Sequence, residues 1–298
     1  MRIQSSKGRA IAALLIAALA VFGLAGTAQA KLTGNYTKFA QCPYKSAEVR
    51  RCLFSVTSSG EVVLGSKKVP IVNPVTLQAG VLKPVEGTAH AVAATNGVTL
   101  APVPQPVPGG LAGLVNCKEI KEPFLRFACE LTFENGLTGL NSTLELARPA
   151  SEITINETNL IGEEGPALKL PVKVRLENPF LGSSCYVGSS SSPIKWELTS
   201  GETNPPPPNT KIFGTSGTLS FLEEGRIAVL KGTSLVDNAW AAPGASGCGG
   251  FLVELVLDPI INAAAGLPAT AGHNTAILKN EVNTTTAAAV KTNDEENP

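Results

Sequence analysis

The chain has 298 residues, of which 43% are hydrophobic and 5% aromatic, and its 24 Lys and Arg residues balance 24 Asp and Glu residues. A net charge of zero excludes a nucleic-acid binder that depends on a strongly basic surface, and the composition excludes a membrane protein with many spans. Only two His and three Asp residues are present, which leaves few groups for the acid–base and metal chemistry of most hydrolases.

The first thirty residues have the layout of a secretory signal peptide. Arg2, Lys7 and Arg9 precede an apolar stretch over 10–26, and an Ala-Gln-Ala sequence ends at Ala30. A basic start, an apolar centre and small residues at the end are typical of a segment that signal peptidase removes. We predict cleavage after Ala30 and a secreted, extracellular protein with no membrane span after cleavage. A permanent membrane anchor is the alternative.

Proline and glycine divide the mature chain. Proline occupies every second position over 102–108, and two glycines follow at 109–110. Alternating prolines favour a stiff, extended backbone, which predicts a linker or loop over 102–110. It would separate a smaller β region, 31–101, from a larger one, 111–280. The alternative is one domain with an exposed proline-rich loop, since all-β domains often exceed 200 residues. The last residues, 281–298, carry Thr and Ala runs and an acidic end, which predicts a disordered tail.

Runs with an apolar residue at every second position predict β-strands. The clearest covers 168–176, where Lys169, Lys173 and Arg175 alternate with apolar residues and face outward. Pro171 cannot donate a ladder hydrogen bond, which favours an edge strand or a bulge. Similar runs occur at 144–146, 153–155, 194–198 and 219–221, and a nearly continuous apolar run at 251–257 predicts a strand buried on both sides.

Clusters of Gly, Ser, Asn and Pro separate these short runs. Short strands separated by turn residues in this way predict an all-β, antiparallel β-sandwich or barrel-like fold with few short helices. The best helix signal is Asp258 as an N-cap before Pro259, with Gly266 ending a short helix over 260–265.

All six cysteines follow the predicted cleavage point. In an oxidising compartment an even number of cysteines indicates disulfides, here three, which would staple the fold. Fifteen pairings are possible, and the spacing favours Cys42–Cys52, Cys117–Cys129 and Cys185–Cys248. A zinc or redox site would need CxxC pairs or nearby His residues. Because neither is present, we predict no metal and no cofactor.

Residues with catalytic potential are sparse. His90 and His273 lie in small-residue and polar surroundings, and the sequence contains no GxSxG motif, so a Ser-His-Asp site is not indicated. Two adjacent pairs, Glu163-Glu164 and Glu223-Glu224, could supply the two carboxylates of a glycoside hydrolase. Pairs in such Gly-rich turns are more often solvated corners.

Trp240 is the aromatic residue with the clearest binding potential. It lies in a Gly, Ala and Pro-rich loop close to Cys248, where an exposed indole would contact a sugar or a protein. The alternative is that Trp240 packs over a disulfide, as Trp does in many sandwiches. The basic row of Lys169, Lys173 and Arg175 could meet an anionic polymer, although such a row is normally the wet face of a strand.

The block from Leu170 to Gly188, which reads LPVKVRLENPFLGSSCYVG, resembles a stretch found in uncharacterised secreted proteins of actinobacteria. The segments Val69-Pro70-Ile71 and Leu77-Gln78-Ala79-Gly80 are similar in kind. The resemblance covers most of 38–257 and implies an exported, β-rich protein with cysteines. No catalytic residue accompanies it.

Together these features predict a secreted, non-enzymatic protein with a binding or structural role at the cell envelope or outside it. Its partner would be an envelope polymer or another extracellular protein, not nucleic acid. A polysaccharide hydrolase that uses Glu163, Glu164, Glu223 or Glu224 is one alternative. Another is a proteinase inhibitor that presents the disulfide-braced segment from Pro43 to Arg51.

Overall fold

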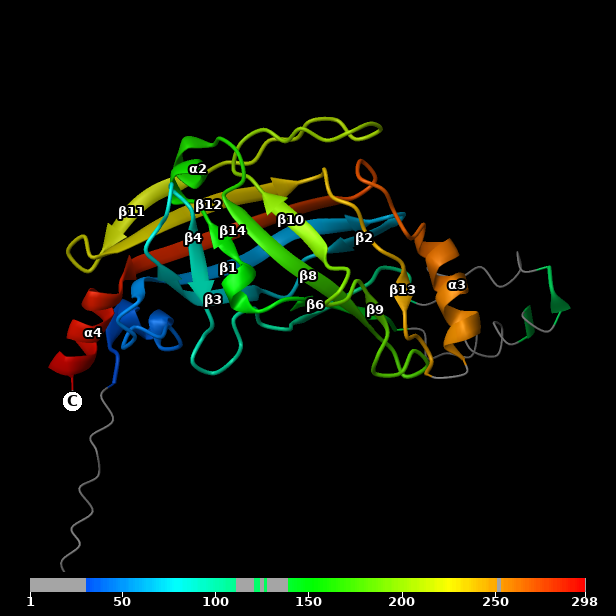
Figure 1. Ribbon diagram of the computed structural model, residues 1–298, viewed down its shortest axis with the longest axis horizontal. Helices are drawn as coiled ribbons and strands as arrows, with labels where there is room; N and C mark the ends of the chain where they lie inside the picture. Colours follow the sequence, from blue (N-terminus) through cyan, green and yellow to red (C-terminus); the bar gives the residue numbers. More distant parts are fainter. Residues whose placement is uncertain (1–30, 111–120, 124–125, 128–138, 251–252, 298) are drawn as a thin grey trace, which may run out of the picture.

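Fourteen antiparallel strands form one continuous sheet in the computed structural model, which describes residues 31–110, 121–123, 126–127, 139–250 and 253–297 (Figure 1). The strands are β1 (Val49–Leu64), β2 (Lys67–Pro70), β3 (Val75–Leu82), β4 (Ala89–Val92), β5 (Pro104–Pro106), β6 (Asn141–Leu146), β7 (Thr154–Ile155), β8 (Leu168–Glu177), β9 (Tyr186–Val187), β10 (Ile194–Leu198), β11 (Thr218–Leu222), β12 (Ile227–Asp237), β13 (Ala245–Ser246) and β14 (Thr275–Thr286). The helices are η1 (Gly34–Phe39), η3 (Ala150–Glu152), α2 (Glu157–Gly162), α3 (Glu254–Ala265) and α4 (Ala287–Glu296).

The sheet folds over itself into two layers. Its main path runs β11-β12-β14-β1-β3-β4-β7-β8-β6-β5, and the short strand β4 connects the layers because it pairs with β3 and with β7. The long strands β12, β14, β1 and β3 form one layer, and β8 with β6, β9 and β10 forms the other (Figure 1). The terminal strands β11 and β5 do not pair with each other, so the sheet is not closed. The predicted all-β antiparallel fold is confirmed.

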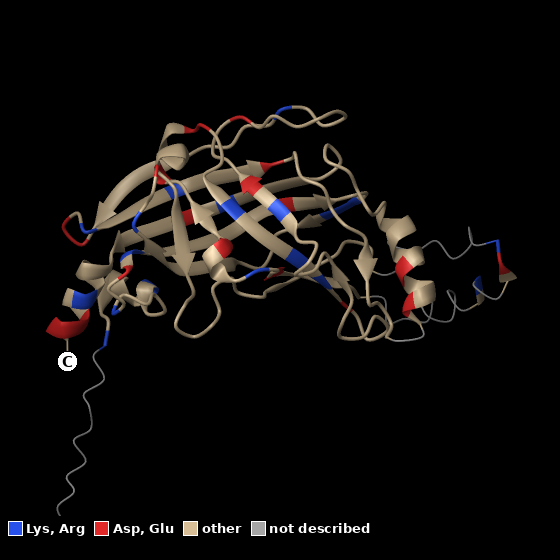
Figure 2. Ribbon diagram, in the orientation of Figure 1, with Lys and Arg blue, Asp and Glu red and all other residues tan. Residues whose placement is uncertain are grey.

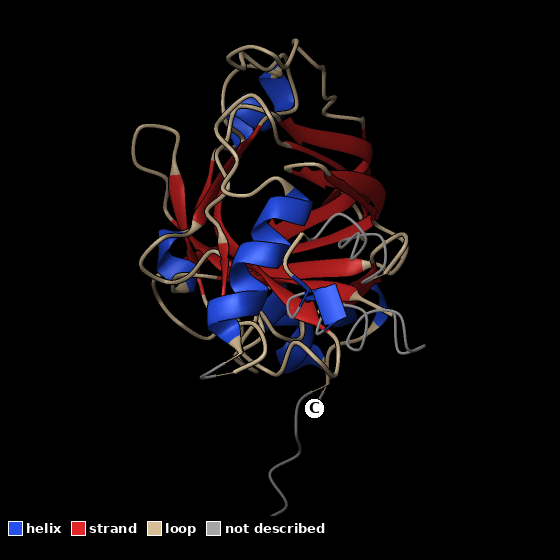
Figure 3. Ribbon diagram, turned by 90° about the vertical axis from the view of Figure 1, so that its right-hand side faces the viewer, coloured by secondary structure: helices blue, strands red, loops and turns tan. Residues whose placement is uncertain are grey.

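Alternation of apolar residues explains how the layers pack. On β8, Leu170, Val172, Val174 and Leu176 are buried while the residues between them are partly exposed. These side chains belong to the main core, which fills the space between the layers. Helix α3 lies across one end of that space, as the view in Figure 3 shows.

A smaller core lies at the opposite end of the molecule. It gathers Tyr36 and Phe39 of η1, Ile227 and Val229 of β12 and Val290 of α4. Two disulfides, Cys42–Cys52 and Cys185–Cys248, have the pairing that the cysteine spacing predicts. The first belongs to the smaller core and the second to the main core. The predicted pair Cys117–Cys129 lies outside the described residues.

The boundary predicted at 102–110 does not separate two units. Within it β5 forms a strand that pairs with β6, and β1 and β3 belong to the same sheet as β14. Proline is tolerated in β5 because this strand lies at the end of the path and pairs on one side only. The two predicted β regions therefore share one sheet.

The prediction of a disordered tail over 281–298 is wrong. Strand β14 continues to Thr286 between β1 and β12, and α4 follows with Val290 fully buried. Thr favours strands, and the Asn283 side chain is held by hydrogen bonds to Lys38 and Glu281. The polar composition alone suggests disorder, because Lys38 and the neighbouring strands β1 and β12, which order this segment, come from distant parts of the chain.

Two local predictions also change. The run at 251–257 was predicted as a strand, but residues from Glu254 onward form α3, since a short apolar run does not distinguish a buried strand from a helix. The helix ends at Gly266 as predicted, with a left-handed φ of 65°. Pro171 lies in β8, an interior strand and not an edge strand. On one side of β8, β7 pairs with residues up to Lys169 and β6 pairs with residues from Val172 onward, so Pro171 lies between these two partners. Its missing N–H therefore leaves no ladder partner unpaired.

Candidate functional site

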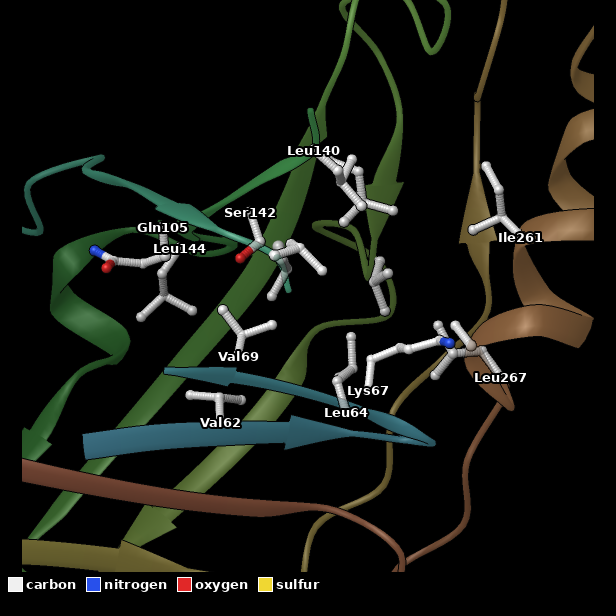
Figure 4. Close-up of a pocket in the computed structure, with 15 residues that line it drawn as sticks. Val62, Leu64, Lys67, Val69, Gln105, Leu140, Ser142, Leu144, Ile261 and Leu267 are labelled. Carbon is white, nitrogen blue, oxygen red and sulfur yellow. The ribbon is translucent and has the colours of Figure 1, made fainter. Parts of the chain in front are cut away.

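An apolar cavity lies between the two layers at the end that α3 covers (Figure 4). Strands β1 and β2 contribute residues such as Val62 and Val69, and β6 and β8 contribute Leu144 and Val174 from the facing layer. Helix α3 adds Ile261. The cavity has a volume of about 80 Å³, which is several times the room that one water molecule needs. We call it the first cavity.

Strand and helix periodicity place these side chains. On β6, Ser142 and Leu144 point inward because residues two apart share one face of a strand. On α3, Ile261 and Ala265 are one turn apart and therefore lie on the same face of the helix. Hence β6 and α3, which are distant in sequence, present small or apolar side chains to one space.

Gln105 forms the polar bridge at the open edge of the sheet. Its side-chain Oε1 accepts hydrogen bonds from the backbone N–H groups of Val72 and Asn73, each at 2.9 Å. Its Nε2 donates to the Asn73 carbonyl at 2.8 Å. The side chain thus links β5, which pairs with β6, to the segment after β2, which pairs with β1. Because Gln105 is only 6% exposed and well paired, it is a fixed part of the cavity wall.

The hydroxyl of Ser142 is a polar group that the fold does not use. Ser142 is 9% exposed and lines the first cavity, and within the described part of the chain its side chain has no hydrogen-bond partner. A hydroxyl that lines a cavity can be satisfied by water or by a polar group of a ligand. Such a group in an otherwise apolar cavity is typical of a site that a ligand or water completes.

A second cavity of about 70 Å³ lies deeper between the layers. Leu77, Leu170 and Trp196 line it, and it shares Gln105 and Leu144 with the first cavity. Trp196 is 1% exposed, and its indole Nε1 is without a partner among the residues that the structure describes. The two cavities are therefore neighbours, separated by the side chains that they share.

Lys67 brings charge to the first cavity. It comes from β2, is partly exposed and is, among the described residues, the only charged side chain that lines either cavity. Figure 4 shows its amine close to Leu267, at the end of the cavity near α3.

Trp240 does not form the exposed contact that its loop predicted. It is only 4% exposed, and its ring lies edge-on to Trp196 with the centroids 5.9 Å apart. Its Nε1 donates to the carbonyl of Asp237 at 3.2 Å. The indole therefore packs in the main core, and its partner there is another Trp. A composition rich in Gly, Ala and Pro indicates a loop but does not reveal what that loop packs against.

The predicted acid pairs do not assemble a catalytic centre. Glu163 accepts hydrogen bonds from Ser216, and Glu223 accepts them from Asn35. Ser216 precedes β11 and Glu223 follows it, and at about 3.3 Å per residue this places them roughly 23 Å apart. The two carboxyl groups of a glycoside hydrolase lie about 5–10 Å apart.

The electrostatics of these acids also differ from those of an acid catalyst. Hydrogen bonds from the backbone and side chain of Ser216 lower the pKa of Glu163, and hydrogen bonds from Asn35 lower the pKa of Glu223. A general acid in glycoside hydrolysis needs a raised pKa. Glu164 and Glu224 lie in the same exposed turns. The four residues thus act as turn and capping groups.

The outward basic row is neutralised by neighbouring acids. Lys169 pairs with Glu197 at 2.9 Å, while Lys173 and Arg175 each lie 3.3 Å from Glu145. Figure 2 shows these blue and red positions mixed along the crossing strands. The face therefore presents no run of one sign to an anionic polymer.

The segment proposed as an inhibitor loop, from Pro43 to Arg51, forms consecutive turns up to Glu48 and then enters β1. The Pro43 carbonyl accepts from Ser46 N–H at 3.0 Å, and the Ser46 carbonyl accepts from Val49 N–H at 3.2 Å. Arg51 forms an ion pair with Glu157. Protease inhibition by this segment stays a prediction.

Among the described residues no three His, Cys, Asp or Glu side chains gather as a metal site, and none of the helices there has the length and apolarity to cross a bilayer. Comparison with protein families, curated proteins and solved structures finds no match to this chain. The resemblance to secreted actinobacterial proteins therefore stays a prediction, and the cavities are the feature on which a functional argument can be built.

Sequence reasoning did not find the cavities. One signal was present, because Ser55 and Ser142 occupy inward positions of strands where apolar residues are expected. That signal becomes visible only when the strands are known to face each other.

Proposed function

We propose that this protein is exported and binds an apolar ligand between the two layers of its sheet. The first cavity carries the proposal, because protein interiors are close-packed and few voids exceed the size of a water molecule. Ligand sites are concave, mostly apolar and furnished with a few polar groups. The first cavity has this character, with Ser142, Gln105 and Lys67 as its polar groups.

Binding without catalysis is supported by what lines the cavity. Ser142 is the only hydroxyl among the described lining residues, and no His, Asp or Glu lines the same space. A nucleophilic hydroxyl needs an adjacent base, and the imidazoles and carboxylates that serve most often as bases are absent there. The proposed role is therefore to hold or carry a molecule.

The NMR chemical shift of dissolved xenon tests the proposal, because xenon is a small apolar atom that enters dry apolar cavities. We expect a saturable shift in the presence of the chain that starts at Lys31. Val174→Phe places a ring in the first cavity, so it should weaken xenon binding at least tenfold. Ser58→Val is the matched control because Ser58 is exposed on β1, and it should leave binding unchanged. Equal xenon binding by all three proteins would rule out the first cavity as the site.

Export is proposed from the signal-peptide layout of 1–30 and is supported by the two disulfides, which persist mainly in oxidising compartments. The intact mass of protein recovered from outside the producing cells tests this. The expected mass is that of a chain that begins at Lys31 with its cysteines oxidised. Recovery of full-length chain only inside the cells would contradict export.

A further inference from the structure

We propose that two copies of this protein associate through strand β11, whose free edge pairs antiparallel with β11 of the second copy across a two-fold axis. This inference is independent of the proposed function, because no residue of β11 lines either cavity. Four features of the strand support it: its unpaired edge, its lack of the residues that protect other edges, its exposed apolar side chains, and the symmetry of its sequence.

Strand β11 ends the main path of the sheet and pairs with β12 alone (Figure 1). An antiparallel strand directs alternate N–H and C=O groups to its two sides. The backbone groups of β11 that point away from β12 therefore have no strand partner in the described part of the chain. Just before β11 the edge is already occupied, since Gly214 N–H donates to the Gly201 carbonyl at 2.9 Å. The free edge thus coincides with the five residues from Thr218 to Leu222.

The other edge strands are protected in the ways that natural sheets use. Among the described strands, β2, β5, β10 and β13 also pair on one side only. Three of them carry proline or charged residues: Lys68 and Pro70 in β2, Pro104 and Pro106 in β5, and Lys195 and Glu197 in β10. Strand β13 has only two residues. Strand β11 reads TLSFL and has no proline and no charge. Proline, charge and shortness are the features that keep an edge from pairing with another chain, and β11 lacks all three.

Two large apolar side chains on β11 are exposed. Leu219 is 47% exposed and Phe221 is 60% exposed. They lie opposite Leu230 and Ala228 of β12, so they share one face of the sheet. Leu222 belongs to the other face and packs against the smaller core. A strand that offers both free backbone groups and apolar side chains is a template for strand addition.

The sequence of β11 favours a second copy of itself as the added strand. A two-fold axis at Ser220 pairs all five residues and places Leu219 of each copy opposite Phe221 of the other. An axis at Leu219 or at Phe221 would leave part of the strand unpaired. Cross-strand pairs of this kind are the contacts that stabilise a sheet. Because β11 has no charged residue, no like charges face each other in this register.

The charges beside β11 are complementary in the same register. The turn 223–226 after β11 contains two Glu and one Arg and is therefore negative overall. Its Glu224 side chain is 86% exposed. With the axis at Ser220, this turn lies two strands from the exposed Lys231 of the other copy, at a backbone separation of about 10 Å. Long side chains of opposite sign attract at this range.

Sedimentation velocity of the chain that starts at Lys31 tests the association. A pair of five-residue strands forms a small interface, so we expect a dissociation constant on the order of 10–100 µM. Between about 1 and about 500 µM protein, the sedimentation coefficient should rise from that of a monomer toward that of a dimer. Two-fold pairing uses the free β11 edge of each copy, so growth should stop at the dimer. A monomer at every concentration, or growth beyond the dimer, would overturn the inference.

Charges placed on the exposed face of β11 test the register. In Leu219→Lys/Phe221→Lys the lysines of the two copies face each other, so the dissociation constant should rise at least tenfold. In Leu219→Lys/Phe221→Glu each lysine faces a glutamate of the other copy, and most of that loss should be recovered. Val85→Lys/Leu255→Lys is the matched control, because both residues are exposed and lie outside β11, and it should associate like the wild type.

The variants also show how this prediction can fail. Equal dissociation constants for the double-lysine variant and the control would overturn β11 as the interface. Equal losses for the double-lysine and the lysine–glutamate variants would overturn the axis at Ser220. If the double-lysine variant does not fold, Phe221→Lys alone replaces it, with Leu255→Lys as its control, and a loss of at least threefold is expected.

Hydrogen exchange locates the interface directly. Backbone amides of β11 that gain partners in the dimer should exchange about three- to eightfold more slowly at about 300 µM than at about 1 µM protein. The edge strand β10 should exchange at the same rate at both concentrations. A dimer that protects β10 and leaves β11 unchanged would assign the contact to another edge and overturn the inference.

Discussion

The main core and the smaller core differ in how completely they are filled. In the smaller core Phe39 and Val290 are at most 1% exposed, and neither cavity touches this cluster. In the main core the same kinds of residue leave two neighbouring cavities, and α3 lines the first of them. The smaller core joins the two ends of the described part of the chain, since η1 and α4 both pack there. The comparison teaches that the core at which the two ends of the described chain meet is filled more completely than the core between the two layers.

Truncating one large apolar residue in each core should give the largest contrast. Phe39→Ala should lower the free energy of unfolding by about 3–5 kcal/mol because the ring is fully packed. Leu144→Ala should lower it by about 2 kcal/mol, the low end of the range, because this side chain already borders two cavities. Denaturant unfolding measures both values. An equal loss would mean that the cavities do not loosen the main core.

The disulfides offer a second contrast between the cores. Replacing Cys185 and Cys248 by Ala opens a loop with a sequence separation of 63, and replacing Cys42 and Cys52 opens one of 10. Loop entropy predicts losses of about 4 and about 3 kcal/mol, respectively. Thermal unfolding of the two double variants provides the ranking. The reverse order would show that packing in the smaller core outweighs loop length.

Removing the unused hydroxyl should stabilise the main core. Ser142→Val replaces a buried polar group without a described partner by an apolar one that fills part of the first cavity. We expect a gain of about 1 kcal/mol in the free energy of unfolding, together with weaker xenon binding. The exposed control Ser58→Val should change the stability by less than about 0.5 kcal/mol. A destabilised Ser142→Val would indicate that water already satisfies the hydroxyl.

Two carboxylates should make stability respond to pH with opposite signs. Burial raises the pKa of Asp237, whose oxygens accept from the N–H groups of Glu197 and Ala239. Its contribution to stability is present below its unfolded pKa of 3.8 and falls as the pH rises through the raised folded pKa. Hydrogen bonds from Asn35 lower the pKa of Glu223, so its contribution is present above 4.5 and is lost as the pH falls through the folded pKa.

Unfolding between pH 3 and pH 7 measures these slopes. Relative to Asp237→Asn, the wild type should become less stable as the pH rises. Relative to Glu223→Gln, it should become more stable over the same range. These are the smallest effects expected, and slopes of the same sign would show that one of the two environments is described wrongly.

Individual residues show where sequence reasoning reached its limit. Asp258 was predicted as a helix N-cap, but α3 begins at Glu254, and the carboxylate accepts from Gly247 and Cys248 N–H at 3.0 and 2.9 Å. An N-cap and a loop anchor need the same residue type, because both are carboxylates that accept backbone N–H groups. Sequence alone does not say which N–H groups come within reach.

The sequence by itself determined the local features: strands with period two, two of the disulfide pairs, and the end of α3 at Gly266. Each depends on residues close in the chain or on a small set of possible partners. Only the tertiary structure decided that Trp240 packs against Trp196, that Glu163 and Glu223 lie apart, and that β14 is an interior strand. The cavities were also decided by the tertiary structure, because their walls come from strands of both layers. A cavity forms only where the inward side chains of two strands that are distant in sequence face each other and do not fill the space between them.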